Sequence, residues 1–177
     1  MGNFTIVKEE DQFYRIIKLT PFRRTPGVFF DFVPLDALAR IDAIDRVIHE
    51  RAAVSPGPVD GIEQPWYMHP HQEDNLIVLF GTRHVDIYAR KHGRVESFVV
   101  TPNRIEHNGE VVCSEPAMLV WPRAVFHRIR SGPEGSASLN FAVHHEGFDL
   151  RTNFNIYDLD TETGKFRVLR EGYKDQL

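Results

Sequence analysis

Three histidines stand where their imidazole rings can meet inside a β-structure. His69 and His71 are two residues apart directly ahead of an apolar run, and residues at i and i+2 of an extended chain point to the same face. His127 shares a strand face with Val125 and Ile129, so its ring points to the apolar, inward side, where a lone imidazole needs a partner. Imidazole is the commonest metal-binding side chain, and the three rings therefore predict an interior metal site.

Two adjacent carboxylates follow the histidine pair. Strict strand alternation from His69 and His71 places Glu73 on their face, with Asp74 beside it. Three neutral imidazoles and a carboxylate suit divalent Fe, Mn, Ni, Zn or Co, with positions left open for a substrate or dioxygen. The alternative is that His127 is a core histidine bonded to a carbonyl and that the other two histidines lie in an exposed loop.

Two further residues are candidates for catalysis. Tyr67 shares the face of His69 and is placed to hydrogen-bond a ligand, or is an aromatic residue at a barrel mouth. His145 shares a strand face with Leu139, Phe141 and Val143, so it either lines the cavity or is a structural histidine with satisfied hydrogen bonds.

Short strands separated by turn signals must carry these residues. From Trp66 onward, strand-like segments recur at the roughly ten-residue spacing of an all-β sandwich or barrel, with Asn108-Gly109 as a hairpin turn. Further strands are predicted at residues 13–19 and 28–33, before the histidines, and at residues 154–159 and 166–169, after the barrel. Between them, apolar residues at helical spacing predict a helix over residues 35–51; they are Leu35, Leu38, Ile41, Ile44 and Ile48.

The segment that contains the histidines resembles the cupin superfamily. His69, His71 and Gly81 match its first motif, and Pro122 and His127 match its second, in which Ala124 replaces a glycine. Counting back from Gly81, the family register selects Asp74 as the metal-binding carboxylate, although the spacing from His71 is shorter than usual. The resemblance covers about residues 60–147.

The resemblance implies an RmlC-like cupin, a small single-domain metal-binding cupin with a double-stranded β-helix (jelly-roll) barrel, extra N- and C-terminal strands and one helix. We expect one domain over residues 1–177, with an arm and helix over 1–60, the barrel over 61–147 and an extension over 148–177. The expected function is that of a metalloenzyme acting on a small molecule, with dioxygenase chemistry preferred. Its metal ligands would be His69, His71, His127 and one carboxylate, Asp74 or Glu73, and Tyr67 and His145 would be catalytic.

Two other functions remain open for this fold. In a metal-free nucleotide-sugar epimerase or isomerase, a histidine acts as the general base, and His69 or His71 would pair with a carboxylate. The Arg-Gly that precedes the histidine in such epimerases is replaced here by Tyr67-Met68. The second alternative is a non-enzymatic protein that binds a small ligand.

Composition limits the partners and the location. The net charge of −4 disfavours a nucleic-acid surface, which is normally basic. Cys113 is the single cysteine, which fits a reducing compartment, and the sequence shows neither a signal peptide nor an apolar membrane span. We therefore expect a cytoplasmic protein with a small-molecule substrate. We also expect a homodimer, in which residues 13–33 or the tail beyond Phe148 add a strand to the partner's sheet.

Overall fold

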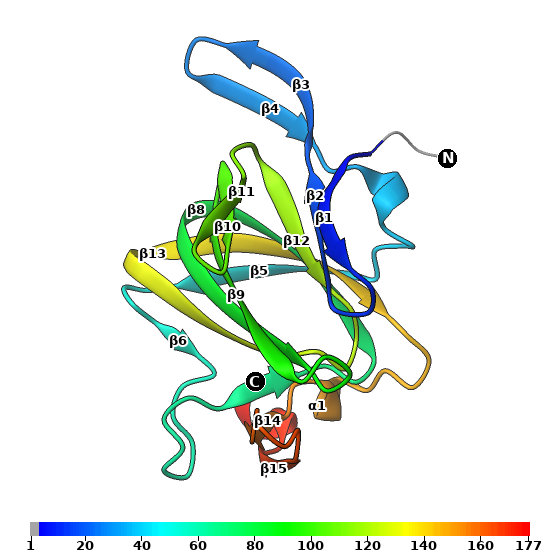
Figure 1. The fold of residues 1–177 in the computed structure, drawn as a ribbon, viewed down its shortest axis with the longest axis vertical. Coiled ribbons are helices and arrows are strands. Elements are labelled where there is room, and N and C mark those ends of the chain that lie inside the picture. Colours follow the sequence, from blue (N-terminus) through cyan, green and yellow to red (C-terminus); the bar gives the residue numbers. More distant parts are fainter. Residues whose placement is uncertain (1–3) are drawn as a thin grey trace.

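Two long strands, β8 (Gln72–Ala89) and β13 (Phe126–His144), form the centre of the fold in the computed structural model, which describes residues 4–177. They pair with each other along both of their halves, and each half belongs to a different face of the barrel (Figure 1). Among the described residues, thirteen strands join one hydrogen-bonded sheet. The prediction of an all-β jelly roll is confirmed.

The first face combines the N-terminal half of β8 with the C-terminal half of β13. On one side, β8 pairs with β12, which in turn pairs with the N-terminal strands β2 and β1. On the other side, β13 pairs with the edge strand β5. The bounds are β1 (Ile6–Glu10), β2 (Tyr14–Lys18), β5 (Ala43–His49) and β12 (Ala117–Trp121).

The second face uses the opposite halves of the two long strands. There β8 pairs with β9, and β9 leads through β10 to β11, while β13 pairs with β6 and β7 and so connects to β14 and β15. The bounds are β6 (Val54–Ser55), β7 (Trp66–Met68), β9 (Arg94–Thr101), β10 (Arg104–His107), β11 (Glu110–Cys113), β14 (Ile156–Leu159) and β15 (Phe166–Arg170). The expected terminal strands are thus present.

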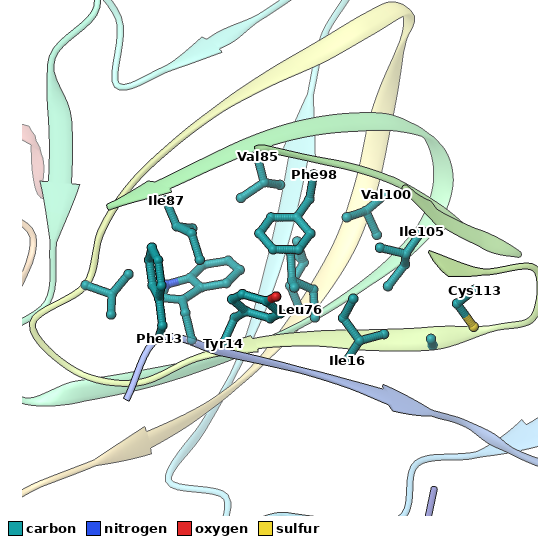
Figure 2. Packing of buried hydrophobic residues seen from close by; sticks show 14 of the residues in the cluster. Phe13, Tyr14, Ile16, Leu76, Val85, Ile87, Phe98, Val100, Ile105 and Cys113 are labelled. Carbon is teal, nitrogen blue, oxygen red and sulfur yellow. The ribbon is translucent and has the colours of Figure 1, made fainter. Parts of the chain in front are cut away.

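The largest apolar core lies between the two faces. Val85, Ile87, Phe98 and Val100 of the second face meet Ile16 of β2 from the first (Figure 2). Removing such side chains from water is the main force that holds two sheets together. The core fills part of the barrel interior, and the remaining part is lined by polar residues.

The predicted helix over residues 35–51 is wrong. Only Leu35–Ala37 forms a short 3-10 helix, η1, and the later part is strand β5. In this strand Ile44 and Ile48 are exposed, and Asp45 and Val47 point inward. Two isoleucines four positions apart satisfy both a helical and a strand period, and pairing with β13 decides in favour of the strand. The α-helix of the described chain is α1 (Leu150–Asn153), and a second 3-10 helix, η2 (Gly172–Asp175), lies near the C-terminus.

One hairpin stands apart from the barrel. Strands β3 (Thr20–Thr25) and β4 (Val28–Phe32) pair only with each other and project beyond the barrel end (Figure 1). Three of their aromatic rings cluster with centroids 4.6–5.3 Å apart, those of Phe22, Phe30 and Phe32, and each is at least 45% exposed.

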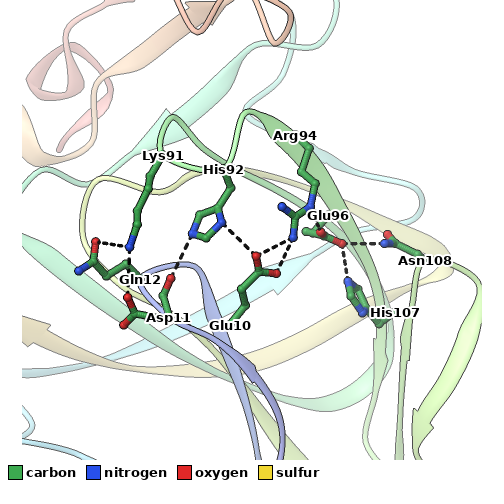
Figure 3. A network of polar contacts seen from close by, with 9 residues as sticks. All are labelled: Glu10, Asp11, Gln12, Lys91, His92, Arg94, Glu96, His107 and Asn108. Atoms are coloured by element: carbon green, nitrogen blue, oxygen red, sulfur yellow. Dashed lines mark hydrogen bonds and ion pairs between the residues drawn. The ribbon is translucent and has the colours of Figure 1, made fainter.

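A polar network connects the N-terminal hairpin, formed by β1 and β2, to the second face (Figure 3). Buried Glu96 of β9 accepts hydrogen bonds from Arg94, His107 and Asn108. Arg94 also pairs with Glu10 at the end of β1. The network therefore joins strands that are distant in sequence.

Two glycines allow three strands to approach closely. Gly81 of β8 has φ +70°, and a Cβ there would collide with the carbonyl oxygen of Gly135 in β13. Gly135 has φ +81°, and a Cβ there would lie 2.6 Å from the carbonyl oxygen of His49 in β5. Only glycine fits at both positions.

Candidate active site

A pocket of about 330 Å³ occupies the polar part of the barrel interior. Its walls come from β5, β6, β7, β8, β12 and β13, and Phe154 lies beside it, just after α1. The volume is within the usual range for small-molecule sites. Its polar and aromatic lining includes Asp45, His49, Tyr67, His69, Asp74, Arg83, Trp121, His127, Ser138 and Asn140.

His69 is held in a defined orientation. The residue follows β7 and is buried, and its Nδ1 lies 2.6 Å from the carbonyl oxygen of Asn153 in α1. A carbonyl oxygen only accepts hydrogen bonds, so Nδ1 carries the proton and donates it. In the neutral ring, Nε2 is then the free base, and it lies 3.6 Å from Oδ2 of Asp74.

Asp74 is fixed by two amide groups. Its Oδ1 accepts hydrogen bonds from Gln72 Nε2 at 2.8 Å and from Asn140 Nδ2 at 2.7 Å. Its Oδ2 is buried and has no hydrogen-bond partner among the described residues. A carboxylate held in this way next to an imidazole can stabilise the ring when it gains a proton.

His127 completes the cluster from strand β13. Its ring centroid lies 4.7 Å from that of His69, and its Nδ1 lies 3.4 Å from the carbonyl oxygen of Val125. Burial, and then the charge of His69, lower the pKa of His127 from 6.5 to about 4. His127 is therefore neutral at physiological pH. The preceding turn contains Ala124 at φ +63°, the conformation for which the cupin motif has glycine.

The structure brings together only part of the predicted set of residues. His69, Asp74 and His127 offer ligand atoms within 4.8 Å of one another. His71 lies in the turn between β7 and β8, where its ring faces Gly147, and Glu73 forms an ion pair with Arg15 at 3.4 Å. Alternation from His69 failed because Pro70 and His71 form that turn rather than continuing a strand.

The two predicted catalytic residues are placed differently. Tyr67 lines the pocket, and burial raises the pKa of its hydroxyl despite a hydrogen bond with Ser55. His145 follows β13, its backbone N–H donates to the carbonyl oxygen of His71 at 2.8 Å, and it is not among the described residues that line the pocket. On β13 the polar residues Ser138 and Asn140 face the pocket instead, and their alternation with apolar residues was the signal that could have identified them.

Comparisons with solved structures identify proteins of similar fold. QdtA, a sugar 3,4-ketoisomerase from Thermoanaerobacterium thermosaccharolyticum in complex with TDP, matches with a TM-score of 0.55 and 12% identity, covering 79% of this chain and 85% of that one. NovW, a 4-keto-6-deoxy sugar epimerase from Streptomyces spheroides, matches at 0.59 and 10%, covering 84% and 71%. The dTDP-4-dehydrorhamnose 3,5-epimerase from Sulfolobus tokodaii matches at 0.54 and 16%, covering 82% and 77%. No protein-family model and no curated protein matches the chain.

These comparisons overturn the expectation of a divalent transition metal as cofactor. The similar structures are sugar ketoisomerases and epimerases, and moving a proton beside a ketone is acid–base chemistry that a histidine and a carboxylate can perform. His71 and Glu73, two of the five predicted ligands, also lie away from the cluster.

In the described residues no helix is long and apolar enough to cross a membrane. The chain has the RmlC-like cupin fold.

Proposed function

We propose that the protein is an isomerase or epimerase that moves a proton at a carbon next to a carbonyl group, in a small polar substrate such as a keto sugar carried on a nucleotide. The observation that carries this proposal is the orientation of His69. Its Nδ1 is bonded to Asn153, and its Nε2 is next to the carboxylate of Asp74 inside a pocket. A histidine paired with a carboxylate is the arrangement expected of a metal-free isomerase on this fold.

Each residue has a defined part in the proposed reaction. His69 Nε2 removes the proton from the carbon, the C–H electron pair forms the enolate, and Asp74 stabilises the resulting imidazolium. Trp121 Nε1–H lines the pocket and has no partner among the described residues, so it can donate to the enolate oxygen. In an epimerisation, a proton returns to the opposite face of the same carbon. In a ketoisomerisation, the carbon that lost the proton bears a hydroxyl group; the proton of this hydroxyl moves to the former carbonyl oxygen while the former carbonyl carbon takes up a proton, so that ketone and hydroxyl exchange places.

Tyr67 is the proposed proton donor for the opposite face. Its ring centroid lies 6.0 Å from that of His127 and 6.4 Å from that of His69. Burial raises the pKa of its hydroxyl, so the group keeps its proton at neutral pH and can donate it. The preference for a dioxygenase is replaced here, because the comparisons favour the isomerase or epimerase alternative.

The test is exchange of a substrate proton with solvent. Nucleotide-linked 4-keto-6-deoxy sugars are incubated with the protein in D₂O, and deuterium at carbon is followed by NMR and mass spectrometry. We expect His69→Asn to lower the exchange rate by about 10²- to 10⁴-fold, because it removes the base. Asp74→Asn should lower it by a smaller factor, and His71→Asn, outside the pocket, serves as the matched control. An unchanged rate in His69→Asn would refute the proposal.

A second copy of the chain is the proposed protein partner. The aromatic cluster on the β3–β4 hairpin is exposed, and Phe29, on the opposite face of β4, is 74% exposed. Of the predicted arm over residues 13–33, strand β2 pairs inside its own sheet, so this hairpin is the part left to reach a partner. Burying its aromatic face in a homodimer would remove a large apolar surface from water.

A further inference from the structure

A buried arginine lines the pocket away from the histidines. Arg83 of β8 is 2% exposed. Its Nε donates to Ser136 Oγ at 3.1 Å, and its Nη2 donates to the carbonyl oxygen of Val47 at 3.2 Å. Ser136 also shares a hydrogen bond of 2.7 Å with Ser131. The partners of the guanidinium are therefore neutral oxygens.

Arg83 has no carboxylate partner within residues 4–177. The two carboxylates that line the same pocket are engaged elsewhere, Asp74 by Gln72 and Asn140, and Asp45 by Asn140 at 3.0 Å. An arginine stays protonated in proteins, and a buried cation without an opposite charge is costly unless a ligand supplies one.

The described groups around Arg83 carry no negative charge that would balance its positive charge. His49 lines the pocket on β5 and bonds to Ser131 at 3.0 Å. Burial, followed by the charge of Arg83, lowers the pKa of His49 to about 4, so this histidine is neutral at physiological pH. The groups next to the guanidinium, namely Ser136, the carbonyl of Val47 and His49, are therefore uncharged at physiological pH.

The register of the two long strands gives the separation between this charge and His127, whose ring centroid lies 4.7 Å from that of the proposed base, His69. Arg83 lies opposite Ser131, whereas His127 lies opposite Ile87, four residues further along each strand. At about 3.3 Å per residue this is about 13 Å between backbones, and the long arginine side chain shortens the gap within the pocket. A molecule of sugar size can therefore contact both ends.

We propose that Arg83 binds an anionic group of the substrate, a carboxylate or a phosphate, while the reacting carbon lies at His69. This inference rests on the proposed function and narrows its substrate class to carbonyl compounds that carry a negative charge several bonds from the reacting carbon. The guanidinium has donors beyond its two protein hydrogen bonds, and arginine binds both kinds of oxyanion in a forked geometry.

The test measures the binding of simple anions without turnover. Inorganic phosphate and acetate are titrated separately into the wild-type protein and into Arg83→Met and Arg83→Lys, with isothermal titration calorimetry as the readout. We expect binding to the wild type that is at least tenfold weaker in Arg83→Met and intermediate in Arg83→Lys, which keeps the charge but loses the fork. The matched control is Arg130→Met, which changes an exposed arginine of β13. Tighter binding of phosphate or of acetate tells which group the substrate carries.

Stability separates a ligand-binding role from a structural one. We expect Arg83→Met to unfold at the wild-type temperature or above it, because it removes a buried charge that has no counter-charge. Absence of anion binding to the wild type, or equal binding to Arg83→Met, would overturn the proposal. A lower unfolding temperature with unchanged anion binding would do the same and would show a structural arginine. If Arg83→Met does not fold, Arg83→Lys decides through the same titrations.

The anion titrations and the proton-exchange experiment test the two proposals separately. If His69→Asn keeps full proton exchange, the proposed function fails while the anion titrations still stand. If Arg83→Met binds anions like the wild type, the assignment of Arg83 fails while the role of His69 is untouched.

Discussion

At His127, burial keeps the imidazole uncharged. Its pKa is lowered from 6.5 to about 4, so between these values the folded protein binds fewer protons at this position than the unfolded chain does. The free energy of unfolding therefore decreases as the pH falls through this window, by at most about 1.4 kcal/mol per pH unit from this residue. In His127→Asn, the decrease between pH 7 and pH 5 should be smaller by about 2 kcal/mol.

Urea denaturation at the two pH values measures this difference. His84→Asn, which changes a half-buried histidine on the outer side of β8, is the control. An identical pH dependence in His127→Asn and the wild type, or an NMR titration of the His127 ring near pH 6.5, would contradict the prediction.

How far single residues could be predicted depended on the local backbone. The face of His127 followed from alternation because strand β13 is regular at that point. His71 and Glu73 were assigned to the same face by the same argument, which fails where Pro70 and His71 turn the chain. Asp74 was selected by counting back from Gly81. Both residues lie in β8, after this turn, so the turn did not affect the count. Asn153 and Arg83 gave no local signal, since their positions depend on contacts between distant segments.

Among the elements, the N-terminal hairpin depends on one buried carboxylate. His107 Nδ1 lies 2.7 Å from Lys8 Nζ, which only donates, so Nε2–H of His107 donates to Glu96. Burial raises the pKa of Glu96, but the hydrogen bonds from Arg94, His107 and Asn108 outweigh it, and the pKa is lowered. The stability from this network is present above the unfolded value of about 4.3 and is lost as the pH falls through the lower folded-state pKa.

We expect Glu96→Gln to lower the free energy of unfolding at pH 7 by about 2 kcal/mol, because it weakens charge-assisted hydrogen bonds in a buried place. The difference from the wild type should shrink in acid. Chemical denaturation across pH measures it, with Glu115→Gln as the control, since Glu115 is an exposed partner of Lys18. Equal loss in both variants, or a difference that persists at low pH, would contradict this view of the network.

The barrel strands could be predicted from the sequence, whereas strand β5 could not. The barrel strands showed both apolar runs and turn residues, whereas residues 43–49 place isoleucines outward and Asp45 and His49 inward. This inverted pattern exists because the inner side of β5 forms the polar pocket. A single sequence therefore indicates a helix here, and only the pairing with β13 gives the strand.

For the whole molecule, we expect a homodimer held partly by the β3–β4 hairpin. Light scattering at low micromolar concentration should give twice the mass of the 20.4 kDa chain. The double variant Phe30→Ser/Phe32→Ser should shift the mass towards the monomer, because it removes apolar surface from the proposed interface. Val111→Ser, which changes an exposed valine of β11, is the control and should stay dimeric. A wild-type monomer at this concentration would refute the dimer.

The contact between Gly81 and Gly135 bears on how this architecture can diverge over generations. Neither position accepts a side chain, because the backbones of β5, β8 and β13 already touch there. The residues lining the pocket are not constrained by that contact, so drift can exchange them one by one while the barrel survives. Descendants of such a chain would retain the two glycines longest, even after the catalytic residues have changed. Ancestry in this lineage should therefore be traced through the residues that have no side chain.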